Sequence, residues 1–189
     1  MGSNNLYNAR FGNYKRSSTL YDLAAWRNGL AFKNRDVTSD GIPIIKIAEL
    51  NSGITSSTSF TSKRFDINLF LKRGDLLFSW SGNPDTSIDI FRFNLDNGWL
   101  NQHIFKIDVN SNLIEREFFF VLMKWLKPRF KRIASNKQTT GLGHITIEDL
   151  KKIEVSVPPV DVQKKISHIY VSIESKIAIN NRINDYLAA

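Results

Sequence analysis

The adjacent prolines Pro158 and Pro159 separate two different hydrophobic patterns, and this break constrains the fold more than any other feature of the chain. Proline is disfavoured inside both helices and central strands, so an element ends here. Before the break, short apolar runs alternate with turn residues. After it, apolar residues recur every three or four positions, at Val162, Ile166, Ile169, Ile173 and Ile177. We therefore predict an α+β chain in three parts: a polar N-terminal arm (1–18), a globular body (19–158) and one long helix (159–189).

Within the body, turn signals and apolar runs predict a mixture of strands and helices. Thr19 as a cap and Gly29 as a stop predict a first short helix. A strand is expected within 41–50. Further strands are expected at 76–80, 88–93 and 100–109, a helix disturbed at Pro128 over 115–135, and a helical turn with a final strand before Pro158.

The composition indicates a folded chain and limits its class. Of the 189 residues 42% are hydrophobic, with 13 Phe and 4 Trp, enough to form a core. No apolar run approaches the roughly 18 residues that span a bilayer, and the first residues, MGSNNLYNAR, do not resemble a secretory signal. Cysteine is absent, which excludes disulfides and thiolate metal sites and fits a reducing compartment. We therefore expect a cytoplasmic protein.

Positive charge is concentrated in one segment. The formal net charge is +8, and no acidic residue occurs between Glu117 and Glu148. Two interpretations are open: a solvated helix face whose counter-charges come from elsewhere, or a surface that contacts phosphates and gains from counterion release. The basic residues of this window are Lys124, Lys127, Arg129, Lys131, Arg132 and Lys137.

Motifs that would indicate catalysis are incomplete. His103, His144 and His168 are far apart, and none has a second histidine three or four residues away, as a helical zinc pair would. The loop TTGLGH lacks the Gly-Lys-Ser/Thr ending of a phosphate-binding loop. Asp85 and Asp89 have a nuclease-like spacing, but Phe91 stands where a lysine is needed. The stretch SGNPDTS is more simply a turn with side-chain-to-backbone hydrogen bonds. We expect no catalytic residue, no metal site and no cofactor bound by this chain.

Polar side chains suited to reading DNA are concentrated in the expected loops. Lys and Arg can contact guanine edges or phosphates, Asn and Gln can contact adenine, and Ser and Thr can contact either bases or phosphates. We expect duplex DNA to be contacted by Lys63, Arg64, Ser81, Asn83, Lys131, Arg132, Lys137, Gln138, Thr139 and Thr140.

The C-terminal helix needs something to cover its apolar stripe. It can fold back on its own body, or it can pair with a second chain by coiled-coil-like packing. We expect the stripe Val162, Ile166, Ile169, Ile173 and Ile177 to make this contact.

Three segments in order, GIPIIKIAELNSGI, KRGDLLFSWSG and TTGLGHITIEDLKKIEVSVPPVDVQKKISHIYVSIESKI, resemble the specificity subunit of Type I restriction–modification enzymes. The resemblance covers roughly residues 19–187. It implies that the body is a target recognition domain for half of a bipartite DNA site, with Lys137 to His144 on the DNA side. It implies a spacer helix over Val162–Leu187.

The resemblance also implies partners. Modification subunits would bind S-adenosylmethionine and methylate adenine, and motor-nuclease subunits using ATP and Mg²⁺ would join them. The usual subunit has two recognition domains and two spacer helices, whereas this chain has one of each. We therefore expect a half-length form that dimerises through its C-terminal helix and reads a symmetric, interrupted site.

The leading hypothesis is a non-catalytic, sequence-specific DNA-binding subunit. Two alternatives stay open. One is a methyltransferase or nuclease subunit whose catalytic carboxylates are dispersed along the chain. The other is a basic assembly scaffold that meets an acidic protein surface and has no sequence-specific DNA binding.

Overall fold

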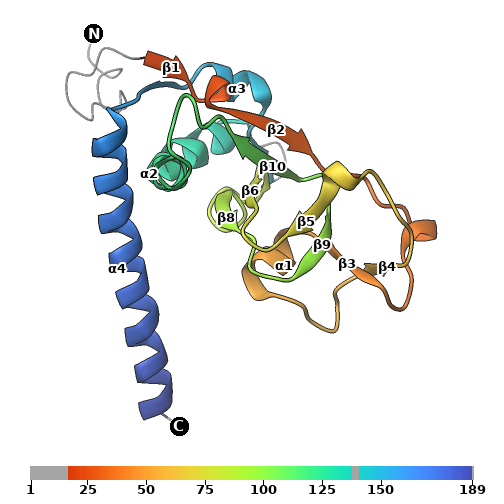
Figure 1. The fold of residues 1–189 in the computed structure, drawn as a ribbon. Coiled ribbons are helices and arrows are strands. Elements are labelled where there is room, and N and C mark those ends of the chain that lie inside the picture. The colour runs from red at the N-terminus through yellow and green to blue at the C-terminus, as the bar shows by residue number, and fades with distance from the viewer. Residues whose placement is uncertain (1–16, 138–140, 189) are drawn as a thin grey trace.

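The computed structural model describes residues 17–137 and 141–188, and it is an α+β fold from which one long helix projects (Figure 1). The first sheet is antiparallel throughout, in the order β2 (Ala24–Asn28), β10 (Ile104–Val109), β6 (Leu76–Ser79) and β8 (Asp89–Arg92). The second sheet has the order β4 (Phe60–Thr61), β3 (Ile42–Ile45), β9 (Asn97–Leu100) and β5 (Phe70–Lys72), with β3 and β9 parallel.

Two short strand pairs complete the sheets. β1 (Ser17–Thr19) pairs with β12 (Glu154–Ser156), and β7 (Ser81–Gly82) pairs with β11 (Gly143–His144). The helices are α1 (Ile47–Ser52), α2 (Arg116–Ser135), α3 (Ile147–Lys151) and α4 (Val160–Leu187). Single 3-10 turns are η1 (Tyr21–Leu23), η2 (Asn34–Asp36) and η3 (Ile67–Leu69).

Strand β6, inside the first sheet, is buried on both faces: one face packs in the core that contains α2 and the other in the core that contains residues of the second sheet. Successive side chains of a strand point to opposite faces. On β6, Leu76 and Phe78 therefore belong to the larger core with α2, whereas Leu77 belongs to the smaller core with Ile45 and Leu100 of the second sheet. This is why β6 is buried along its whole length, the pattern of an internal strand.

Helix α2 supplies more buried residues to the larger core than any other element does. Nine of its side chains are buried, including Phe118, Phe119 and Phe130. The Phe130 ring lies 5.0 Å from that of Phe78 on β6. Glu115 caps the first turn by accepting hydrogen bonds from the backbone N–H groups of Glu117 and Phe118. The helix continues through Pro128, although proline has no N–H to donate to the carbonyl four residues earlier. Pro128 is exposed, so water can donate a hydrogen bond to that carbonyl instead.

Several sequence expectations are confirmed. Strands occur within 76–80 and 88–93, helices occupy 115–135 and the C-terminal stretch, and α3 with β12 precedes Pro158. The strand expected at 41–50 is correct only for its first half, β3, because helix α1 begins at Ile47. The region 100–109 is a strand only from Ile104, since its first residue ends β9.

The expected helix between Thr19 and Gly29 is wrong. After the single turn η1, the chain becomes strand β2, which pairs with β10. The Trp26 ring then packs near those of Phe78 and Phe105, at 6.2 and 6.1 Å. Pairing and aromatic packing with residues far along the chain outweigh the local helix signal.

A truncation in the larger core provides a test of this packing. We expect Phe130→Ala to lower the free energy of unfolding by about 3–5 kcal/mol, because it removes a buried ring and leaves a cavity. Urea unfolding would measure the loss. Tyr186→Ala is the control, since Tyr186 is 77% exposed on α4, and we expect a change within about 0.5 kcal/mol. A loss below about 1 kcal/mol for Phe130→Ala would contradict the assigned core.

Candidate nucleic-acid interface

The pairing of β7 with β11 brings together two loop segments that are far apart in the sequence. Ser81 lies opposite His144 and Gly82 opposite Gly143. Trp80, which precedes β7, extends this pairing with two backbone hydrogen bonds. The Ile145 N–H donates to the Trp80 carbonyl at 2.8 Å, and the Trp80 N–H donates to the His103 carbonyl at 3.2 Å. Gly143 permits a close approach to α2, since a Cβ there would lie 2.4 Å from the Ala134 carbonyl oxygen.

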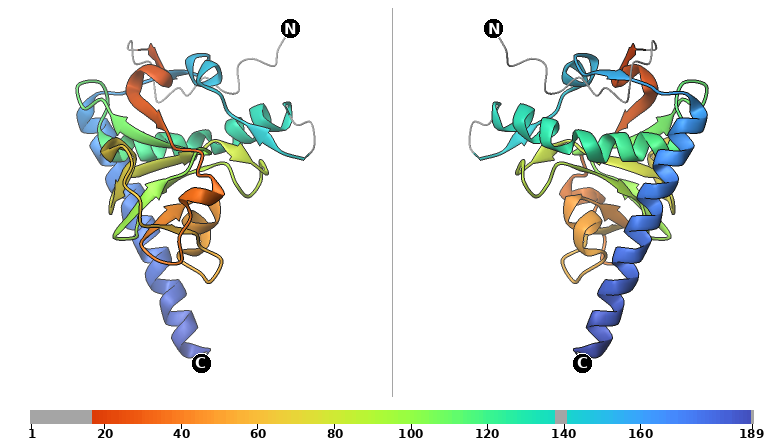
Figure 2. Two further views of the ribbon diagram at one scale, coloured as in Figure 1. Left: turned by 90° about the vertical axis from the view of Figure 1, so that its right-hand side faces the viewer. Right: turned by 90° about the vertical axis from the view of Figure 1, so that its left-hand side faces the viewer.

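The loop after β7 is held by its own backbone, as the stretch SGNPDTS predicts. Asn83 Oδ1 accepts a hydrogen bond from the Asp85 N–H at 2.8 Å, and the Ser87 N–H donates to the Asn83 carbonyl at 2.8 Å. Asp85 is joined to Lys131 of α2 at 3.2 Å. Figure 2 shows this loop, β11 and the far end of α2 projecting together on the side away from α4.

We call the surface formed by β7, β11, the 83–88 loop and the C-terminal half of α2 the distal surface. Of the residues expected to contact DNA, it contains Ser81, Asn83, Lys131, Arg132 and His144. Lys137 lies just beyond the end of α2 and is bonded to Asp149 of α3. Gln138, Thr139 and Thr140 lie outside the described residues.

Lys63 and Arg64 are placed elsewhere, beyond β4 of the second sheet. The Lys63 ammonium donates to the Arg35 carbonyl at 2.6 Å and to Asp36 at 3.0 Å. That pairing, together with backbone hydrogen bonds at Lys33, lowers the pKa of Asp36. The structure therefore does not bring this pair together with the distal surface.

More positive charges of the basic window between Glu117 and Glu148 have carboxylate partners than the sequence indicates. Lys124 lies 3.0 Å from Asp89, and Lys127 pairs with the other oxygen of the same carboxylate. Lys131 pairs with Asp85 and Lys137 with Asp149. The expectation that local neutralisation is missing is wrong for these four lysines, because their counter-charges come from distant segments.

The four paired lysines still outnumber their carboxylate partners. Lys124 and Lys127 share Asp89, whereas Lys131 and Lys137 each have one carboxylate, Asp85 and Asp149. Burial and the neighbouring Arg132 lower the pKa of Arg129, whose guanidinium still remains charged near neutral pH. A polyanion can bind to such a surface because exposed ion pairs are weak and easily exchanged.

Four residues beside Ser81 were missed by the sequence analysis: Asn28, Trp80, Gln102 and His103. The Trp80 indole N–H donates to Asn28 Oδ1 at 3.0 Å, and its ring lies 5.5 Å from the His103 ring and stacks on Phe105. Gln102 Nε2 lies 3.2 Å from His103 Nε2. The available signal was the polar triplet at 101–103, which interrupts the apolar alternation expected for a strand over 100–109.

This arrangement can bind and read a ligand, and the described residues offer little for catalysis. Side chains of Ser81, Asn83, Gln102, His103 and His144 carry the donors and acceptors that distinguish base edges. Within residues 17–137 and 141–188 no group of three or more His, Asp or Glu residues could hold a metal ion. None of the helices in that part of the chain is long and apolar enough to cross a membrane.

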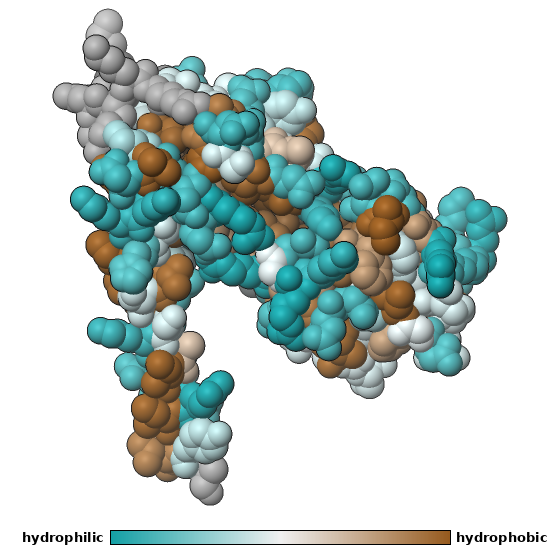
Figure 3. Space-filling view, viewed as in Figure 1, coloured by the Kyte–Doolittle hydropathy of each residue, from teal (hydrophilic) through white to brown (hydrophobic). Residues whose placement is uncertain are grey.

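The C-terminal stripe divides between two environments. Val162 and Ile166 are partly buried, and Ile166 packs against the larger core, so this part of the stripe follows the interpretation in which the helix folds back on its own body. Ile169, Ile173 and Ile177 are 59%, 54% and 54% exposed. Figure 3 shows hydrophobic side chains gathered along the part of α4 that extends beyond the body.

A family model described as the Type I restriction modification DNA specificity domain matches residues 14–189. The Type I restriction enzyme HindI specificity subunit of Haemophilus influenzae is 30% identical over 120 residues, which are 62% of this chain and 26% of that protein. The EcoBI specificity subunit of Escherichia coli is 25% identical over 79% of this chain and 30% of its own length. The chain thus spans about a quarter to a third of these curated relatives.

Solved structures show the same fold. The HsdS subunit from Thermoanaerobacter tengcongensis gives a TM-score of 0.62 at 16% identity, covering 88% of this chain and 39% of that one. The Type I restriction–modification S subunit from M. genitalium gives a TM-score of 0.60 at 16% identity, covering 89% and 41%.

The ion pair between Lys137 and Asp149 gives a prediction with a definite pH dependence. Although burial opposes ionisation of Asp149, hydrogen bonds from Lys137 and Thr146 outweigh it and hold its pKa below the usual 3.8. A depressed folded-state pKa contributes stability above the unfolded pKa, and that contribution is lost as the pH falls through the folded one. We expect Asp149→Asn to cost about 1–3 kcal/mol near pH 7.

The deficit of Asp149→Asn should begin to shrink as the pH falls below about 4, because the unfolded carboxyl then takes up a proton, and it should go on shrinking until the pH passes the lower folded-state pKa. Chemical denaturation from pH 7 to pH 3 would measure it. Glu148→Gln is the matched control: Glu148 also pairs with a lysine, but it is exposed, and we expect little change. A deficit for Asp149→Asn that stays constant with pH would refute the ion pair.

Proposed function

We propose, because this chain belongs to the Type I restriction modification DNA specificity domain family, that it recognises a DNA sequence and catalyses no reaction itself. The observation that carries the proposal is the β7–β11 pairing, which brings the polar side chains of Ser81 and His144 together near the basic C-terminal end of α2. In this proposal the distal surface contacts one half-site. Ser81, Asn83 and His144 read base edges, and Lys131 and Arg132 contact phosphates.

We further propose that the chain acts within a Type I restriction–modification complex in the cytoplasm. The half-site reader would dock modification (methyltransferase) subunits, and restriction (motor-nuclease) subunits would join them. S-adenosylmethionine, ATP and Mg²⁺ would bind those partners. Support comes from the family match and from the relatives, which are named as specificity subunits of Type I restriction enzymes.

We also propose that two copies pair through the free part of α4. Every residue from Ser175 to Leu187 is exposed, and large apolar side chains recur there on the side of the stripe, at Ile177, Ile183 and Leu187. A two-fold pair of half-site readers would select a symmetric, interrupted sequence. The exposed apolar area of α4 supports a protein partner, because isolated surface helices rarely leave so much apolar surface in water.

Selection from randomised duplexes distinguishes this function from the alternatives. A DNA reader should enrich an interrupted motif at moderate salt. A basic scaffold should bind all sequences weakly even at low salt. Cleavage of DNA by the purified chain with Mg²⁺, or its methylation with S-adenosylmethionine, would instead support a catalytic subunit.

Two classes of substitution should separate phosphate contacts from base contacts. We expect the double change Lys131→Ala and Arg132→Ala to weaken binding to every sequence, at least tenfold, and to reduce the salt dependence of the affinity by about two phosphate contacts. His144→Ala should instead change which sequence is enriched. Fluorescence titration at several salt concentrations and repeated selection would measure both. Equal losses on all sequences from His144→Ala would argue against base reading there.

Charge placed on the exposed stripe should separate the pair. We expect Ile169→Asp with Ile173→Asp to yield a monomer, because a carboxylate cannot be buried unpaired in an apolar helix contact. Light scattering at micromolar concentration would measure the mass. Ile179→Asp is the matched control, since Ile179 is 58% exposed on another face of the same helix, and it should disturb pairing much less. A monomeric mass for the unsubstituted chain would overturn the pairing proposal.

A further inference from the structure

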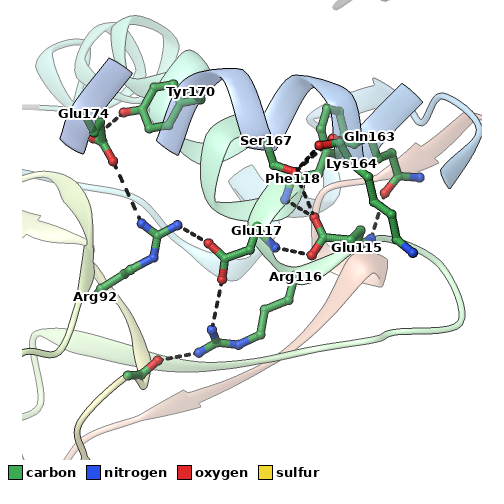
Figure 4. Close-up of polar contacts among 11 residues, drawn as sticks. Arg92, Glu115, Arg116, Glu117, Phe118, Gln163, Lys164, Ser167, Tyr170 and Glu174 are labelled. Atoms are coloured by element: carbon green, nitrogen blue, oxygen red, sulfur yellow. Dashed lines mark hydrogen bonds and ion pairs between the residues drawn. The ribbon is translucent and has the colours of Figure 1, made fainter. Parts of the chain in front are cut away.

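The side of α4 that touches the body carries a row of polar side chains beside the apolar Ile166. Gln163, Ser167, Tyr170 and Glu174 follow one another at intervals of four, three and four residues and therefore share one face. Gln163 and Ser167 are only 3% and 5% exposed. All four make hydrogen bonds to each other, to their own helix or to the α2 end of the body, as Figure 4 shows for the contacts with α2. We call them the docking face.

Gln163 is the first support of the helix. Its Oε1 accepts a hydrogen bond from the Glu115 N–H at 2.7 Å, and its Nε2 donates to the Pro158 carbonyl at 2.7 Å. The side-chain amide thus uses both of its ends. Ser167 adds a weaker contact, with its hydroxyl 3.3 Å from Glu115 Oε2. The start of α4 is therefore fixed to the residue that caps α2.

The second support lies further along the helix and reaches the first sheet. Tyr170 donates its hydroxyl to Glu174 Oε1 at 2.8 Å, and Glu174 Oε2 lies 3.9 Å from Arg92 of β8. Arg92 also pairs with Glu117, and its guanidinium stacks 3.8 Å from the centre of the Phe120 ring. Burial and the bond to Glu174 raise the pKa of Tyr170, so its hydroxyl remains a donor at neutral pH.

Hydrogen bonds at Gln163 and an ion pair at Glu174 restrict a helix differently from an apolar seam. A hydrogen bond weakens steeply when its angle or length changes, whereas apolar contacts tolerate sliding and rotation. Polar residues in helix contacts are known to fix register for this reason. The docking face should therefore determine the direction in which α4 leaves the body.

Because α4 is long, a small change in its direction moves its free end by a larger distance. At about 1.5 Å per residue, Glu174 lies about 16 Å from Gln163 and Leu187 about 36 Å from it. A 1 Å shift at Glu174 would then move the free end by about 2 Å. Across two copies this approaches the roughly 3.4 Å rise of one base pair.

We propose that the docking face, with Arg92 as its partner on the body, determines the number of base pairs between the two half-sites. This inference rests on the proposed function, in which paired α4 helices join two half-site readers. The four residues and Arg92 are positioning residues: they set the distance between the readers and leave the half-site sequence itself unchanged.

The test is the double substitution Tyr170→Phe and Glu174→Gln in the full chain. It keeps the aromatic ring beside Phe120 and removes the hydroxyl and the carboxylate charge that faces Arg92. The matched control is Ser175→Ala with Asp185→Asn, since both residues are exposed on the same helix. Thermal unfolding would confirm that both variants are folded.

The first readout is the helix direction itself. The chain contains no cysteine, so nitroxide labels can be attached at Ala25→Cys on β2 and Asn181→Cys on α4, both at exposed positions. Diluting labelled with unlabelled chain isolates the distance within one copy. We expect the double variant to broaden the distribution of that distance or to shift it by about 2 Å, the displacement of the free end that follows from the length of α4. The control should leave the distance unchanged. An unchanged distance in the double variant would overturn the proposal.

The second readout is the preferred spacing, measured on duplexes that carry the selected half-sites one to several base pairs closer or further apart. We expect the wild type and the control to lose at least tenfold in affinity for each base pair of wrong spacing. The double variant should lose less than threefold over the same change, with the half-site sequence retained. A spacing profile identical to the wild type would overturn the proposal. A wild-type chain that selects no interrupted motif would instead overturn the proposed function, and the label distances would still decide whether the docking face orients α4.

Discussion

Helix α2 is held between the first sheet and α4 by the burial of nine side chains, three of them consecutive phenylalanines. Each large apolar side chain contributes about 1.5–3 kcal/mol on burial, whereas an exposed ion pair contributes about 0–1 kcal/mol. Burial of α2 therefore stabilises the body far more than its lysine–aspartate pairs do. Its two ends support the two candidate interfaces: Glu115 at the N-terminal end contacts α4, and Ala134 at the C-terminal end packs against Gly143 of β11. One helix thus connects the distal surface, which is proposed to read DNA, to the helix that would set half-site spacing.

The lysine–aspartate pairs have a different role from the core. Lys124 and Lys127 share Asp89, and Lys131 reaches Asp85 in the loop that carries Asn83. Such pairs orient long side chains, and two lysines share the single carboxylate of Asp89. Since phosphates compete with carboxylates for the same ammonium groups, the surface would bind DNA with a marked dependence on salt.

Helix α4 presents two faces that meet different requirements. The docking face is polar and is bonded to the body at Gln163 and, through Glu174, at Arg92. The neighbouring face carries Ile169 and Ile173, which are exposed and suited to a second helix. Polar contacts fix an orientation, and apolar contacts supply association energy without strict geometry. A single helix can therefore be oriented by its own body and still pair with a partner.

The sequence by itself determined the elements whose signal is local. Apolar periodicity identified α2, α4 and the strands around Leu77 and Ile90, and Asn-Pro-Asp identified the turn at Asn83. The mixed fold, the family resemblance and part of the distal surface followed from these. The tertiary structure alone decided that residues 24–28 are a strand, that Ser81 meets His144, that four lysines have carboxylate partners and that Ile166 faces the body. These features depend on contacts between residues tens of positions apart, which no local period or turn signal encodes. Hydrogen bonding and packing with those distant residues outweigh the preference of each segment alone.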